Sequence, residues 1–189
     1  GFFMNDTGER ILLAALKLFS ADGFEAVSVS DIAREVGITK GALYRHYPSK
    51  RDIFLSIVGR MEKSDSVLAG NFGLLAENNA ASFPERFRDY AKAMFAYWTE
   101  DEFASRFRKT LTVEQYRNPE MRELFERYLS VGPFEYTRDE FEKAGVRNPE
   151  KRAAELYSAM FFGYSLVDSG VVFSFGDFAD GFFAGEDFK

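Results

Sequence analysis

Apolar residues in this chain recur mostly at three- and four-residue spacings, and strict alternation with polar residues is rare. Such spacing places apolar side chains on one face of an α-helix, whereas a half-buried strand requires alternation. Leu12, Ala15, Leu16 and Phe19 show the helical pattern, and Gly23 follows where the first helix should end. The spacing therefore predicts an all-α fold.

Capping residues and glycines divide the first part of the chain into four helices. Asp6, Ser28, Thr39 and Ser49 each stand where a side-chain oxygen can accept a hydrogen bond from a first-turn backbone N–H. Gly37 permits a sharp turn between the second helix and the third. A longer helix followed by two short helices that a glycine turn joins is typical of a helix-turn-helix.

Charge is distributed unevenly. The net charge of −6 argues against unspecific coating of nucleic acid. Residues 1–52 are electrically balanced, and residues 53–189 carry the whole acidic excess. Within 28–51, however, five basic side chains outnumber two acidic ones, a local charge of +3. The pattern predicts a basic segment on an acidic body.

The chain has no cysteine and one histidine, His46, which excludes several kinds of site. Disulfides, thiolate nucleophiles and cysteine-based zinc sites need cysteine, and a di-iron bundle needs two histidine motifs. No nucleophile elbow or glycine-rich phosphate loop is present. We therefore expect no enzyme activity, no metal and no cofactor.

Membrane insertion is also unexpected. The uncharged apolar stretch over 156–167 has 12 residues, and a spanning helix needs about 20. The absence of cysteine and of a basic-then-apolar leader is typical of a cytoplasmic protein.

The stretch Ser28-Val-Ser-Asp-Ile-Ala-Arg-Glu-Val-Gly-Ile-Thr-Lys-Gly-Ala-Leu-Tyr-Arg-His-Tyr-Pro-Ser-Lys50 resembles the DNA-binding segment of the TetR (tetracycline repressor-like) family. The family pattern of Ile-Ala, Gly-Val/Ile, Ser/Thr-Lys-Gly, Leu-Tyr and a closing lysine is met nearly position by position. The remaining residues match only in length and helical character. The resemblance implies a homodimer in which each subunit presents one recognition helix to DNA. It also implies a C-terminal helical domain that binds a small effector.

The third helix and its flanks hold the expected DNA contacts. A recognition helix places its N-terminal residues at base edges in the major groove. We expect Lys40 to donate to guanine and Ala42 to pack on a thymine methyl. Arg45 is expected to influence sequence choice, with a phosphate contact or a solvated charge as the alternative. The full predicted set is Ser28, Ser30, Thr39, Lys40, Gly41, Ala42, Tyr44, Arg45, His46 and Lys50.

Phosphate contacts are assigned to Tyr44, His46 and Lys50 by the resemblance, and each side chain carries a suitable donor. Ser28 and Ser30 stand at the start of the second helix, where they could also bind phosphate. Plain helix capping is an equal alternative for Ser28, and a core position is the alternative for His46.

Two domains are expected: a helix-turn-helix DNA-binding domain over 1–50 and an effector-binding and dimerisation domain over 51–189. The second domain should bring the total to about nine helices, with a break at Gly132-Pro133 and a last helix from about 177 to 188. A loop is predicted by Gly70, Gly73 and Asn78-Asn79.

Two sets of residues in the second domain are assigned to binding. Apolar residues at helical spacing near the C-terminus predict a dimer surface, with intrachain core as the alternative; they are Leu156, Met160, Gly163, Val167, Phe178 and Phe182. Aromatic residues of the middle helices are candidates for an effector pocket, which would suit a hydrophobic ligand or a cation; they are Phe95, Trp98, Phe103, Phe107, Tyr116, Phe161 and Phe162.

The sequence thus predicts a transcriptional regulator, most simply a repressor that a small effector releases from a palindromic operator. The expected partners are double-stranded DNA, an effector of unknown identity and a second copy of the chain. An activator, a repressor that needs a co-repressor, and a helical binding protein without DNA function are the alternatives.

Overall fold

A computed structural model of the chain describes residues 7–71 and 81–188, and within these segments it contains only helices. The α-helices are α1 (Thr7–Asp22), α2 (Val29–Val36), α3 (Lys40–His46), α4 (Lys50–Asn71), α5 (Phe83–Glu100), α6 (Glu102–Glu114), α7 (Pro119–Leu129), α8 (Val131–Lys143), α9 (Pro149–Asp168) and α10 (Phe175–Phe183). A short 3-10 helix, Glu186–Phe188, follows. The all-α prediction is confirmed, and these ten α-helices are close to the expected number.

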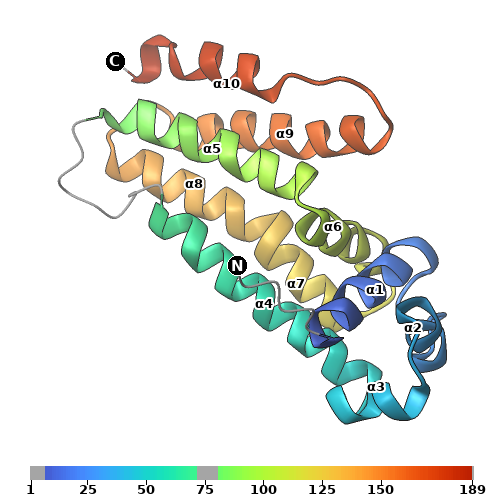
Figure 1. Ribbon diagram of the computed structural model, residues 1–189. Coiled ribbons are helices and arrows are strands. Elements are labelled where there is room, and N and C mark those ends of the chain that lie inside the picture. The colour runs from blue at the N-terminus through green and yellow to red at the C-terminus, as the bar shows by residue number, and fades with distance from the viewer. Residues whose placement is uncertain (1–6, 72–80, 189) are drawn as a thin grey trace, which may run out of the picture.

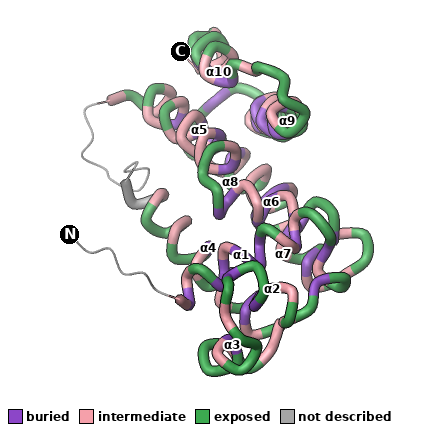
Figure 2. Tube along the Cα trace, turned by 45° about the vertical axis from the view of Figure 1, so that its right-hand side comes forward, coloured by how far each residue is buried: buried purple, intermediate pink, exposed green. Residues whose placement is uncertain are grey.

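The two ends of the molecule have different architectures. Helices α1, α2 and α3 form a small bundle at one end, and α9 and α10 lie at the other (Figure 1). The same separation is visible after rotation of the view (Figure 2). Helix α1 packs on α2, α4 and α6, so the small bundle is joined to the rest of the molecule through α4 and α6. No helix in the described segments is long and apolar enough to cross a membrane.

The predicted caps of α2, α3 and α4 are confirmed. Ser28 and Asp31 form a reciprocal capping box, in which each side chain accepts a hydrogen bond from the other residue's backbone N–H. Thr39 Oγ1 accepts from Ala42 N–H at 3.1 Å, and Ser49 Oγ accepts from Asp52 N–H at 3.1 Å. The hydrogen bonds to Ser28 and its backbone N–H lower the pKa of Asp31, because they favour the charged carboxylate. The predicted cap at Asp6 lies outside the described residues.

The predicted loop after the fourth helix was placed too early. Helix α4 continues through Gly70 to Asn71, so the loop assignment at Gly70 is wrong. A glycine inside a helix costs only about 1 kcal/mol relative to alanine, which tertiary packing readily offsets. The rest of that predicted loop, Gly73 and Asn78-Asn79, lies outside the described residues.

The predicted helix break falls slightly before Gly132-Pro133. Helix α7 ends at Leu129, and both residues lie in the first turn of α8, where proline is tolerated because its missing N–H has no intrahelical partner. A Cβ on Gly132 would lie 2.2 Å from the Arg127 carbonyl oxygen. Glycine therefore permits the two helices to meet at this tight corner.

The last helix begins and ends earlier than predicted. Ser174 caps α10 by accepting a hydrogen bond from Asp177 N–H at 3.3 Å, so the helix starts at Phe175. The expected continuation to Phe188 is replaced by the separate 3-10 turn.

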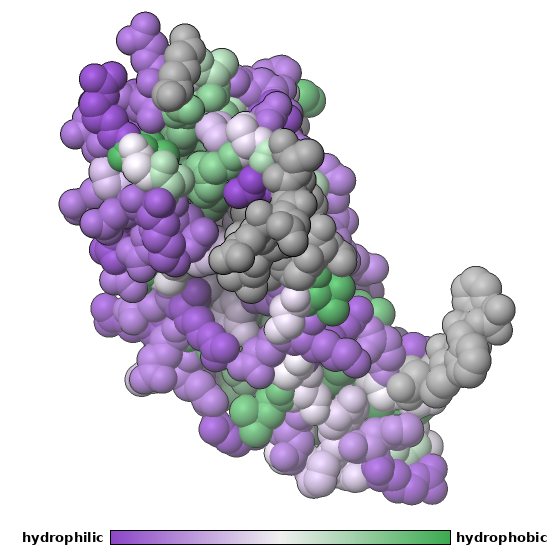
Figure 3. Space-filling view, turned by 90° about the vertical axis from the view of Figure 1, so that its left-hand side faces the viewer, coloured by the Kyte–Doolittle hydropathy of each residue, from purple (hydrophilic) through white to green (hydrophobic). Residues whose placement is uncertain are grey.

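Phenylalanine rings cluster where the ends of α5, α8 and α10 meet. Ring centroids of Phe87 and Phe141 are 5.0 Å apart, and those of Phe183 and Phe188 are 4.9 Å apart. Edge-to-face and tilted ring pairs of this kind add stability beyond burial alone. Figure 3 shows this end of the molecule, where apolar surface gathers in the upper half within a largely hydrophilic surround.

Candidate DNA-binding surface and ligand cavity

Helix α3 is attached to the small bundle by one side chain and presents the others outward. Leu43 is fully buried, whereas the side chains around it are exposed. Lys40 and Arg45 have no carboxylate within ion-pair distance among the described residues, and Lys40 Nζ lies 5.7 Å from the Tyr44 ring centroid. Of the ten predicted DNA contacts, eight are exposed: Ser28, Ser30, Thr39, Lys40, Gly41, Tyr44, Arg45 and His46.

The other two predicted DNA contacts, Ala42 and Lys50, are half-buried. The Lys50 ammonium donates to the Phe24 carbonyl oxygen at 2.7 Å and lies 4.3 Å from the Phe24 ring centroid. Lys50 therefore fixes the start of α4 to the loop between α1 and α2. Its assignment to a phosphate contact stays a prediction.

The loop between α1 and α2 is also attached to α6. Glu114 is almost fully buried, and its Oε1 accepts a hydrogen bond from Phe24 N–H at 3.0 Å. Gly23 has φ +87°, and a Cβ there would come within 2.8 Å of the same Glu114 oxygen. The backbone N–H and carbonyl of Phe24 are thus both bound, which joins the loop between α1 and α2 to α6 and α4.

A cavity of about 380 Å³ opens among α4, α5, α7, α8 and α9. This volume falls in the range of small-molecule sites, about 300–1,000 Å³. The walls are mostly aromatic and aliphatic, and five of the described lining residues are tyrosines. The lining residues are Asp65, Phe87, Tyr90, Ala91, Met94, Trp98, Arg127, Tyr128, Gly132, Pro133, Tyr136, Thr137, Leu156, Tyr157, Met160 and Tyr164.

Asp65 is an unusual component of this wall. Its Oδ1 is shut off from solvent and has no hydrogen-bond partner, and the same is true of the Tyr128 hydroxyl. Burial raises the pKa of Asp65 to about 6; the charge of Arg127 opposes this shift and that of Glu62 adds to it. Unsatisfied buried polar atoms are rare in native proteins, so these two require an explanation.

Only Trp98 of the predicted effector residues lines the cavity. Phe95, Phe103 and Phe107 are buried in the core instead, where Phe95 lies between Tyr164 and Phe175 with ring centroids 5.4 Å and 4.6 Å away. Tyr116 is 88% exposed beyond the end of α6. These assignments are corrected, because aromatic character alone does not distinguish a core face from a cavity wall.

The outer face of α9 differs from the predicted dimer surface. Leu156 and Met160 line the cavity, and a Cβ on Gly163 would meet the rings of Phe95 and Phe173. The intrachain alternative therefore holds for these three residues, whereas Val167, Phe178 and Phe182 are half-buried and stay candidates.

Phe161 and Phe162, predicted to line the effector pocket, lie on the exposed side of α9 instead, 42% and 62% exposed. On that side they are accompanied by small residues: Ala154, Ser158 and Ser165.

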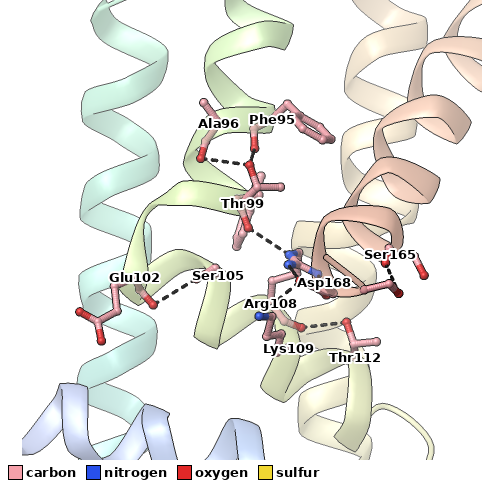
Figure 4. Close-up of polar contacts among 12 residues, drawn as sticks. Phe95, Ala96, Thr99, Glu102, Ser105, Arg108, Lys109, Thr112, Ser165 and Asp168 are labelled. Carbon is pink, nitrogen blue, oxygen red and sulfur yellow. Dashed lines mark hydrogen bonds and ion pairs between the residues drawn. The ribbon is translucent and has the colours of Figure 1, made fainter. Parts of the chain in front are cut away.

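An ion pair between the buried Arg108 and the partly exposed Asp168 joins α6 to α9 beside the cavity. Arg108 donates to both carboxylate oxygens of Asp168, each at 2.7 Å, and to the Trp98 carbonyl oxygen at 3.0 Å. Figure 4 shows Arg108 turned toward Asp168 at the end of α9. Burial raises the pKa of Asp168, but hydrogen bonds from Arg108 and the charges of Arg108 and Lys109 outweigh it, so the pKa is lowered overall. No pattern in the sequence predicts this pair, since its members lie 60 residues apart.

Comparisons with known proteins agree with this geometry. Residues 11–57 match the family described as bacterial regulatory proteins, tetR family. The helix-turn-helix regulator YerO of Bacillus subtilis is 34% identical over 52% of this chain and 37% of its own length. The regulator AcrR of Shigella flexneri is 39% identical over 42% of this chain and 34% of its own length. The chain thus spans little more than a third of the length of these relatives.

Other matches extend along nearly the whole chain. YdgC of Bacillus subtilis is 26% identical over 84% of this chain and 92% of its own. A fatty acid metabolism regulator of Clostridium perfringens has the same fold, with a TM-score of 0.66, 20% identity and coverage of 92% and 94%. The fold and the exposed helix α3 define a helix-turn-helix module joined to a larger helical body. The segment over residues 11–57 is thus similar to the DNA-binding part of the tetR family, and the rest of the chain resembles such regulators in fold.

Proposed function

We propose that this protein is a homodimeric, cytoplasmic repressor that binds a palindromic DNA operator through α3 and is released by a small, largely hydrophobic or aromatic effector. The observation that carries the proposal is the exposure of the polar side chains of α3 around a single buried anchor, Leu43. A helix held in this way can enter the major groove while its bundle stays folded.

The proposed effector site is the aromatic cavity. Its volume and composition suit a small apolar molecule, and it lies beside Trp98, whose carbonyl oxygen is bound by α6 through Arg108. Helix α6 in turn holds Phe24 in the DNA-binding bundle through Glu114. A similar fold, SmeT, 20% identical with a TM-score of 0.65 over 94% of this chain and 90% of its own, was solved as a complex with triclosan.

The proposed dimer surface is the outer face of α9 together with α10. Large exposed apolar side chains are unfavourable in water when they gather on one face, and Phe161 and Phe162 do so here. Neighbouring small residues would let the same helix of a second subunit approach closely. A symmetric pair then presents two copies of α3, which explains how an acidic chain could obtain enough phosphate contacts.

Selection of genomic DNA fragments by the purified protein tests this function. We expect recovery of one inverted repeat, with half-site centres separated by about one helical turn, 10–10.5 base pairs, or a multiple of it. Affinity should fall steeply with salt, because each neutralised phosphate contributes about −0.9 to the slope of log K against log salt. Failure to enrich any sequence, both alone and with cell extract as a source of co-repressor, would contradict the proposal.

A further inference from the structure

The cavity contains a negative charge that nothing in the described structure neutralises within it. The carboxylate of Asp65 on α4 forms part of the wall, and its Oδ1 is buried without a donor. Burying a carboxylate without a partner is costly unless something supplies a counter-charge. A carboxylate on the wall of an open, otherwise apolar cavity can select a ligand by its charge.

The other charges nearby do not fill this role. Arg127 also lines the cavity, but its guanidinium pairs with Glu62 at 3.1 Å, and its side chain is 60% exposed. It lies against the Tyr128 ring, with the guanidinium carbon 5.3 Å from the ring centroid. Asp65, Glu62 and Arg127 together therefore leave one negative charge in excess, which disfavours an anionic ligand.

The aromatic walls also favour a positively charged ligand. Ring faces of tyrosine and tryptophan attract cations within about 6 Å of the centroid, and this attraction strengthens in a desolvated site. The cavity is lined by Trp98 and five tyrosines, and the unpartnered Tyr128 hydroxyl can accept a hydrogen bond from an ammonium. A positive group could thus find a carboxylate, a hydroxyl and ring faces in one place.

We infer that the effector is a protonated amine on an aromatic body, with its N–H group on the Asp65 carboxylate and its rings among the tyrosines and Trp98. This inference rests on the proposed function, because it specifies the ligand class of the same cavity. An N–H donor is required, since the buried oxygen lacks a hydrogen bond as well as a counter-charge.

Three probes that share one diphenylpropyl body separate charge from hydrophobicity: 3,3-diphenylpropylamine, 3,3-diphenylpropan-1-ol and 4,4-diphenylbutanoate. Trp98 is the chain's single tryptophan and lies in the wall, so its fluorescence reports occupancy of this cavity specifically. We expect the amine to bind at least tenfold more tightly than either the alcohol or the carboxylate at pH 7.5.

Substitution of Asp65 sharpens the test. D65N should weaken amine binding at least tenfold and leave the alcohol within twofold, and it should fold, because it removes a buried charge that lacks a partner. E123Q is the matched control. It removes the same charge from an exposed side chain of α7 that does not line the cavity, and should change amine binding by less than threefold.

Lowering the pH should weaken amine binding in the same way as D65N, because it removes the charge of Asp65. In the free protein Asp65 takes up a proton around pH 6, while the amine keeps its charge, so affinity should fall about tenfold per pH unit below that point. Burial raises the pKa of the surrounding tyrosines far above this range, so they stay neutral. The groups that interact with Asp65 are Glu62 on α4, Tyr90 and Tyr97 on α5, and Arg127 and Tyr128 on α7.

Equal binding of the amine and the alcohol, unchanged amine binding by D65N, or no change of Trp98 fluorescence with any probe would overturn the inference. Tighter binding of the carboxylate would do so too, and would leave the cavity an effector site for anions. DNA selection with ligand-free protein is independent of all these outcomes, so failure of the repressor proposal would be recognised separately.

Discussion

Replacing both Lys40 and Arg45 with alanine is expected to lower affinity for the selected operator at least a hundredfold. Each good bidentate contact to a base contributes about 1–3 kcal/mol of discrimination, and two such contacts in each half-site account for the loss. Both side chains are exposed and support no packing, so the melting temperature should stay unchanged. Fluorescence anisotropy with labelled operator and with a scrambled duplex measures the effect.

A second double variant separates base recognition from general electrostatics. Lys143 and Lys151 are exposed on α8 and α9, outside the DNA-binding bundle, and replacing both with alanine removes the same charge. This control should bind the operator within threefold of the unmodified protein. An equal loss in both variants, or retained specificity when Lys40 and Arg45 are absent, would show that α3 does not read the sequence.

Replacing Asp168 with alanine is expected to lower the free energy of unfolding by about 2–4 kcal/mol. The substitution leaves the Arg108 guanidinium, whose side chain is 5% exposed, without its charge partner. Breaking a fully buried pair costs about 3–5 kcal/mol, and the partial exposure of Asp168, 30%, reduces that figure. Urea unfolding followed by circular dichroism measures the loss at pH 7.

The pH dependence gives a further check on this ion pair. The pKa of Asp168 is lower in the folded chain than in the unfolded chain, so its stabilising contribution is complete above the ordinary value of 3.8 and is lost as the pH falls through the folded value. The free energies of unfolding of the unmodified protein and of the Asp168→Ala variant should therefore become equal in acid. Asp180, which pairs with Lys92 at the surface, offers a matched substitution to alanine that should change stability little. Equal losses at both positions would contradict a special role for the pair of Arg108 and Asp168.

The fold of the helix-turn-helix end of the molecule could be predicted from the sequence because its signals are local. The capping boxes, the positive φ of Gly37 and the isolation of Leu43 on α3 all depend on residues only a few positions apart. Helical periodicity likewise identified most of the later elements. It missed the continuation of α4 through Gly70, because one glycine costs a helix only about 1 kcal/mol, too little to end it.

The cavity could not be predicted in the same way, because it depends on which helix faces meet. Residues Phe87, Ala91, Met94 and Trp98 form one stripe along α5, and this spacing could have been read as a single wall. Nothing in the spacing shows that α4, α7, α8 and α9 complete it. Asp65 in particular lies in a polar stretch of α4, where an acidic residue is ordinarily solvated.

The central claim is that the cavity and the DNA-binding surface belong to one switch, and reciprocal linkage tests it most directly. Calorimetry would compare the affinity of the tightest-binding of the three diphenyl probes for the free protein and for its operator complex. A coupling of about 1–3 kcal/mol predicts binding about 5- to 150-fold weaker in the complex, with an equal loss of operator affinity when the probe is bound. Identical probe affinity with and without operator would contradict the account.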